Sequence, residues 1–110
     1  MTDLDLQLAN WAAQKEQRLT IGDALDQPRE LDHTLVFRKR ARAVAAAHTL
    51  DAVGYRTSIR SRFLRSTVEA TRVDTLADEN VVRFLTEVAG IAAEHGGQYD
   101  GFGGSIVRAP

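Results

Sequence analysis

Two kinds of apolar pattern alternate along the chain, and their order constrains the fold more than any other feature. In residues 78–95, apolar side chains recur every three or four residues, the period of one face of an α-helix. The alanine-rich stretch 39–53 has the same period and ends at Gly54, a residue type that often stops a helix. The predicted inner faces are Val81, Phe84, Leu85, Val88, Ile91 and Ala92 for the first, and Ala43, Val44, Ala47 and Leu50 for the second.

Other stretches alternate strictly between apolar and polar side chains, which is typical of a β-strand with one buried face. The predicted strands are 31–38, 55–63, 65–71 and 98–107, the last interrupted by glycines. His33, Leu35 and Phe37 would point inward from the first strand. The second and third strands would be joined by a turn near 63–65. Their predicted inward side chains are Tyr55, Thr57, Ile59, Ser61 and Phe63, followed by Ser66, Val68 and Ala70.

The first 22 residues form a separate helical pattern. Thr2 and Asp5 have the spacing of a capping box, and Gly22 is a plausible stop. Residues 23–30, which include Pro28, then predict a connector. The side chains that would share one side of this amphipathic helix are Leu4, Leu8, Trp11, Ala12 and Leu19.

After this helix, the order β-α-β-β-α-β predicts an α+β domain over residues 31–110. Two helices with one apolar stripe each would cover one face of a four-stranded antiparallel sheet, which is a ferredoxin-like two-layer sandwich. The helix 1–22 is an addition to that sandwich. Trp11 then has to be buried on the open sheet face or against a second subunit, so a homodimer through this helix is one alternative.

Composition narrows the function classes. The chain has 110 residues, which suits one domain, and no cysteine, which excludes disulfides and thiol nucleophiles. No apolar run approaches the roughly 18 residues of a membrane-spanning helix. The first residues do not form a secretory signal. We therefore expect a cytoplasmic protein with no membrane partner.

The chemistry-bearing residues form no recognisable catalytic or metal-binding motif. His33, His48 and His95 lack a second ligand at metal-binding spacing. The sequence Gly103-Gly104-Ser105 is not a nucleophile elbow. We therefore expect no enzymatic activity, no metal and no cofactor, and we interpret His33 as a structural histidine.

Charge is distributed unevenly along the chain. Residues 35–72 carry a net charge of +7, whereas the segments before and after them carry −4 each. Within the basic segment, Arg56, Arg60, Arg62 and Arg65 gather on and beside one predicted hairpin. They form either a solvated sheet face or a surface that binds an anionic partner, since arginine pairs with carboxylate or phosphate in bidentate fashion.

Nucleic acid is the alternative partner for this arginine hairpin. Sheets that bind RNA present aromatic side chains on their open face for base stacking. Tyr55 and Phe63 alternate with the arginines and are predicted to face the core, which ranks a protein partner above RNA. A small immunity protein that neutralises a toxin domain is a third possibility.

The end of the last predicted helix and the strand after it resemble those of the regulator of ribonuclease E activity B family. The residues that carry the resemblance are Ala92-Ala93-Glu94-His95-Gly96-Gly97-Gln98-Tyr99-Asp100-Gly101-Phe102. Upstream features agree with this family. They are Pro28-Arg29-Glu30-Leu31-Asp32-His33, Phe37, the alanine-rich helix and Gly54-Tyr55. The resemblance covers roughly residues 21–107. Its best-known members are strongly acidic, whereas this chain has a basic middle.

The resemblance implies a non-enzymatic protein that binds the endoribonuclease ribonuclease E and restrains it. For the motif itself, the functional alternative to a purely structural role is that Asp100 and Phe102 join the arginine hairpin as partner contacts. The residues expected to maintain the motif are Gly54, Gly96, Gly97, Tyr99 and Gly101. A Gly101 with positive φ would make Gly101→Val destabilising.

Overall fold

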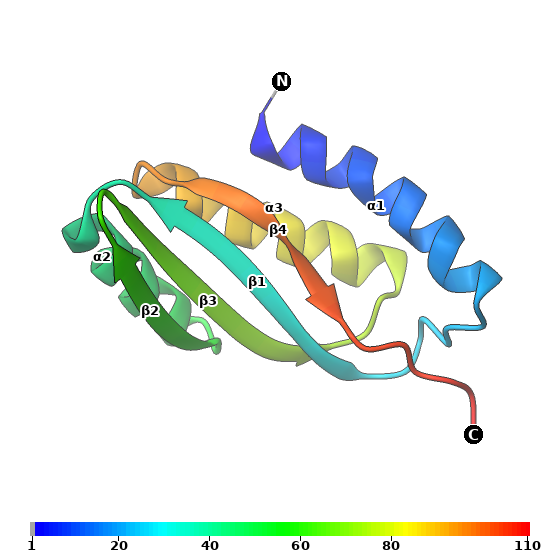
Figure 1. Ribbon diagram of the computed structural model, residues 1–110. Coiled ribbons are helices and arrows are strands. Elements are labelled where there is room, and N and C mark those ends of the chain that lie inside the picture. Colours follow the sequence, from blue (N-terminus) through cyan, green and yellow to red (C-terminus); the bar gives the residue numbers. More distant parts are fainter. Residues whose placement is uncertain (1) are drawn as a thin grey trace.

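A four-stranded antiparallel sheet with three helices forms the molecule, and the computed structural model describes residues 2–110 (Figure 1). The elements are α1 (Asp3–Thr20), β1 (Arg29–Phe37), α2 (Arg40–Ala52), β2 (Arg56–Arg62), β3 (Arg65–Asp74), α3 (Asp78–Glu94) and β4 (Gln98–Gly104). The strand order is β2-β3-β1-β4. The predicted α+β class and the predicted order of elements are confirmed, although β4 ends at Gly104 rather than at Val107.

The two central strands supply one side of the core. β1 pairs with β3 along its whole length, from Arg29 opposite Asp74 to Phe37 opposite Ser66. Alternate side chains of both strands point toward the helices, so the predicted inward faces are confirmed. The buried set is Leu31, His33, Leu35 and Phe37 on β1, and Ser66, Val68 and Ala70 on β3.

Helices α2 and α3 cover one face of the sheet and leave the other face open (Figure 1). All six predicted inner side chains of α3 are buried, because a stripe at helical spacing has only one way to avoid water. In α2 the small residues Ala43 and Ala47 are buried with Leu50, as predicted. Ala46 is buried too, whereas Val44 is only half-buried at the rim.

The first helix lies on neither of the two surfaces expected for it. α1 packs against α3 and β4 beyond the edge of the sheet (Figure 1). Trp11 is buried there, with its ring centroid 6.1 Å from that of Phe102. Because Trp11 is buried within its own chain, its burial does not require a second subunit. Ala12 and Leu19 are exposed, so the predicted inner face of this helix was partly wrong.

A buried ion cluster joins the end of α1 to the start of β1 and to the segment that follows β4. Asp23, in the predicted connector, accepts hydrogen bonds from Arg18 Nη1 at 2.9 Å and from Arg29 Nη1 at 2.7 Å. The Arg29 guanidinium also donates to the carbonyl of Ser105, and the Val107 amide donates to Asp23. The connector is therefore built into the domain, and β1 already begins at Arg29 within it.

Candidate binding surfaces

The open face of the sheet carries the arginines predicted from the alternation. Arg56, Arg60 and Arg62 are exposed, and the strand register places them opposite Thr71, Thr67 and Arg65 of β3. The predicted hairpin arginines therefore share one surface, with Arg65 at its end. The register continues across the sheet to Asp32, Thr34 and Val36 of β1.

Charges on this open face are mixed and loosely paired. Arg56 lies 3.5 Å from Glu30, and Arg60 lies 3.8 Å from Glu69. Exposed ion pairs of this kind contribute little to stability. Their side chains are therefore free to form new pairs with a charged partner at small cost.

Of the two hairpin aromatics predicted to face the core, Tyr55 is buried as predicted, whereas the prediction for Phe63 was wrong. Its side chain is 95% exposed at the tip of the β2–β3 turn, next to Leu64, which is 85% exposed. The alternation was extended one residue past the end of β2, into the turn, where the strand period no longer applies. Phe63 has φ 55°, which is unusual for a bulky residue, and the Arg62 guanidinium lies 5.9 Å from its ring centroid.

A second basic segment lies beside the hairpin. Arg38, Lys39, Arg40 and Arg42 follow β1 and are all exposed. Arg40 Nη1 donates to Ser61 Oγ at 2.8 Å, which ties this segment to β2. These residues were not predicted as a binding surface, although four of the five residues in 38–42 are basic.

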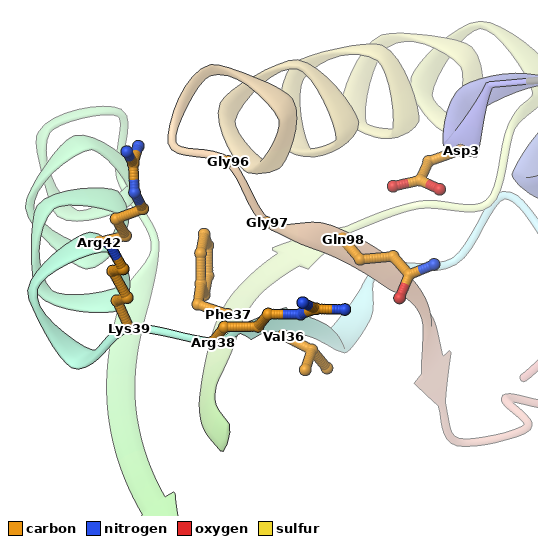
Figure 2. A pocket seen from close by; sticks show the side chains of 9 residues that line it. All are labelled: Asp3, Val36, Phe37, Arg38, Lys39, Arg42, Gly96, Gly97 and Gln98. Carbon is orange, nitrogen blue, oxygen red and sulfur yellow. The ribbon is translucent and has the colours of Figure 1, made fainter. Parts of the chain in front are cut away.

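A cavity of about 670 Å³ opens on the other side of this basic segment (Figure 2). Arg38, Lys39 and Arg42 line one side, and Gly96, Gly97 and Gln98 line another. The Phe37 ring forms part of its floor and lies so close to Gly97 that an added Cβ would stand 2.2 Å from it, so this position admits only glycine. The one carboxylate in the lining, Asp3, accepts a hydrogen bond from the Tyr99 amide. The cavity is therefore lined by three positive side chains and one negative side chain, a net positive charge that suits an anion.

In the motif around Asp100, the aromatic side chains pack in the core and the Asp100 side chain faces solvent. Gly101 has φ 105°, and the pairing of β4 with β1 shifts register there, between His33 and Leu35. This bulge turns both Tyr99 and Phe102 inward, although they are three residues apart. Asp100 stays exposed. The structure therefore separates the two predicted partner contacts, because Phe102 packs on Trp11 and Phe84 inside the chain.

Gly101→Val is expected to lower the free energy of unfolding by about 1–3 kcal/mol, since a β-branched residue at that φ is strained. Gly103→Val is the matched control, because a Cβ there contacts nothing and its φ is ordinary. Urea unfolding of the two variants is the measurement. Equal stabilities would show that the bulge tolerates a side chain and that Gly101 is dispensable for the fold.

His33 lies at the centre of the aromatic core. Its Nδ1 is 2.7 Å from the Tyr99 hydroxyl, and its ring contacts those of Tyr55, Phe84 and Phe102. Burial lowers the pKa of His33 from 6.5 to about 4, and the charge of Arg72 adds to this effect. A neutral, fully buried imidazole with no opening to solvent supports its interpretation as a structural residue.

The other histidines lie apart from it. His95 Nε2 is 3.1 Å from Thr49 Oγ1, and His48 is exposed on α2. Within residues 2–110, no group of three His, Asp or Glu side chains is arranged to hold a metal ion. Over the same residues, no helix has the length and apolarity to cross a bilayer.

Comparison with known proteins identifies the family. A search of curated proteins returns no match. The family model described as regulator of ribonuclease activity B, in contrast, matches residues 16–104, which includes the whole sheet and most of the ion cluster. Since this match covers most of the chain, the protein belongs to the regulator of ribonuclease activity B family.

Proposed function

We propose that the protein is a non-enzymatic regulator that binds ribonuclease E in the cytoplasm through the open face of its sheet. Family membership supports a role in regulating ribonuclease activity. The observation that carries the choice of surface is the arrangement of the helices. Within residues 2–110, all three helices lie away from the open face (Figure 1), and the strand register sets the side chains of that face in rows.

The domain type is part of this proposal. The β-α-β-β-α-β order and the strand order β2-β3-β1-β4 support a ferredoxin-like sandwich with an added helix at its edge. In such a sandwich the sheet is rigid and hydrogen-bonded along all its central strands. Side chains on its open face are therefore held in register before a partner arrives, which lowers the ordering cost of binding.

The chemistry of the open face favours a protein partner. Positive Arg56 and Arg60 alternate with negative Glu30, Glu69 and Asp32. Thr71 donates a hydrogen bond to Asp32 at 2.7 Å, which orients that carboxylate on the surface. A surface of mixed sign discriminates between partners through charge complementarity, whereas it repels a uniform polyanion at its acidic positions. Asp100, exposed on the neighbouring β4, extends this mixed surface.

The test is binding of purified ribonuclease E to the full chain, together with the rate at which the enzyme cleaves RNA as the chain is added. Wild type should bind and slow cleavage. Arg56→Glu should weaken binding about tenfold, since it places an acid beside Glu30 and removes a complementary charge. Arg108→Glu is the control, because it makes the same change in charge on the exposed C-terminal segment.

Two results would contradict the proposal. If wild type leaves ribonuclease E unbound at micromolar concentration, the partner is wrong. If Arg56→Glu and Asp100→Lys both bind like Arg108→Glu, the partner is right but the open face is not the contact surface.

A further inference from the structure

One end of the sheet carries six positive side chains and no acidic residue in the segments that supply them. We name this surface the basic end, and it consists of Arg38, Lys39, Arg40, Arg42, Arg62 and Arg65. Within residues 2–110, none of the six forms an ion pair with a carboxylate. The other exposed arginines of the sheet, Arg56 and Arg60, each lie near a glutamate.

The fold brings the two source segments together. Phe37 at the end of β1 pairs with Ser66 near the start of β3. Arg38, which comes directly after Phe37, and Arg65, which comes directly before Ser66, therefore lie at the same end of these two strands. Arg65 in turn pairs with Arg62 of β2. Arg40 reaches the same place through its hydrogen bond to Ser61. The positive charges of Arg62 on β2, Arg65 on β3 and Arg38 just past the end of β1 repel one another, and an anion bound among them would relieve this repulsion.

The basic end has concave surface on both sides. Arg62 and Arg65 line a hollow of about 560 Å³ on the open face, together with Thr34, Ser61, Thr67 and the neighbouring Arg60. Arg38, Lys39 and Arg42 line the cavity shown in Figure 2, in which the Arg38 side chain extends past Phe37 toward Gln98. An extended polyanion would therefore meet positive charge along a path from one hollow to the other.

An exposed aromatic side chain lies at the same end. Phe63 projects from the turn between Arg62 and Arg65, with Leu64 beside it. Its positive φ is a conformation in which glycine or asparagine is usual. The Phe63 ring therefore stabilises neither the turn nor the core, and its solvent-facing surface is free to stack on a ligand.

We propose that the basic end binds single-stranded RNA, with the arginines contacting phosphates and Phe63 stacking on a base. A positive groove with aromatic side chains is the general design of surfaces that bind single strands. An acidic protein would satisfy the arginines but would leave Phe63 in need of an apolar pocket of its own. The choice of RNA over DNA rests on the proposed function, since a ribonuclease regulator meets RNA.

The experiment measures fluorescence anisotropy of a labelled single-stranded RNA of about 12 nucleotides, within the usual span of such surfaces. Wild type should bind in the micromolar range, with log K falling linearly with log salt concentration. Arg62→Ala combined with Arg65→Ala should reduce the salt slope by about 1.4, since each phosphate contact to a single strand contributes about 0.7. Arg108→Ala is the control and should change neither affinity nor slope.

Phe63→Gly separates stacking from charge. The variant should be at least as stable as wild type to urea, because glycine accepts the φ of this turn. It should bind RNA about fivefold more weakly or worse while its salt slope stays unchanged, because no phosphate contact is lost. The stability measurement guards against loss of binding through unfolding.

Three results would overturn the inference. These are wild-type RNA binding weaker than millimolar, displacement of the RNA by polyglutamate at equal charge concentration, and a Phe63→Gly variant with wild-type affinity. The second result would assign the basic end to an acidic protein. Arg56→Glu, which tests ribonuclease E binding on the open face, should leave RNA binding within twofold, so failure of one proposal is distinguishable from failure of the other.

Discussion

Asp23→Ala is expected to lower the free energy of unfolding by about 3–5 kcal/mol, because it leaves two buried guanidinium groups without their counterion. The Asp23 side chain is completely buried, and those of Arg18 and Arg29 are only 9% and 2% exposed. Burial alone raises the pKa of Asp23, but hydrogen bonds from Arg29 and Arg18 outweigh it and hold that pKa below 3.8. The carboxylate is therefore charged at neutral pH, and its removal leaves two unpaired positive charges in the interior.

Urea unfolding of Asp23→Ala measures this effect, and Asp26→Ala is the matched control. Asp26 lies three residues away in the same connector and is exposed, so its loss should cost less than about 0.5 kcal/mol. Asp23→Asn keeps the shape and the hydrogen-bond acceptor but removes the charge, and it should fall between the two. An Asp23→Ala protein as stable as Asp26→Ala would mean that the cluster does not hold α1 to the domain.

Elements whose burial follows from local periodicity were predictable from the sequence. The α3 stripe and the inward faces of β1 and β3 each have a single way to bury their apolar side chains, so the pattern decides the structure. The position of α1 was not predictable in this way. Trp11, Leu4 and Leu8 pack against the core, but polar contacts also fix the helix in place. The Gln7 side-chain amide donates to the Tyr99 carbonyl, and Arg18 joins the buried ion cluster. Polar contacts between distant segments leave no periodic signal.

Some residues of the candidate surfaces were predictable from the sequence and others were not. The hairpin arginines follow from alternation, which is why their shared face is correct. The contribution of Arg38 to the same end depends on the register between β1 and β3, which no local pattern contains. Phe63 lies one residue past the strand, so the two-residue period was applied there where the backbone interrupts it. Phe102 follows a bulge, which turns it inward together with Tyr99 and which no local pattern signals.

The second large effect is a loss of stability in mild acid that depends on His33. Burial lowers the pKa of this side chain to about 4 from 6.5, with Arg72 lowering it further and Asp74 and Asp32 opposing. Between these two values the unfolded chain binds a proton at this position and the folded chain does not. The free energy of unfolding therefore rises with pH across this window and falls as the pH drops from 6.5 toward 4. At about 1.4 kcal/mol per pKa unit, the loss is about 3 kcal/mol.

Urea unfolding at a series of pH values from about 7.5 to about 4 measures this dependence. In His33→Gln, which retains a hydrogen-bonding group for the Tyr99 hydroxyl but does not titrate, the slope across the window should largely disappear. His48→Gln removes a histidine from the exposed side of α2 and is the matched control. The pKa of Asp23 lies below 3.8, so loss of its charge destabilises the fold only at lower pH. If His33→Gln keeps the wild-type slope, the buried imidazole is not the group that titrates, and other groups account for the pH dependence.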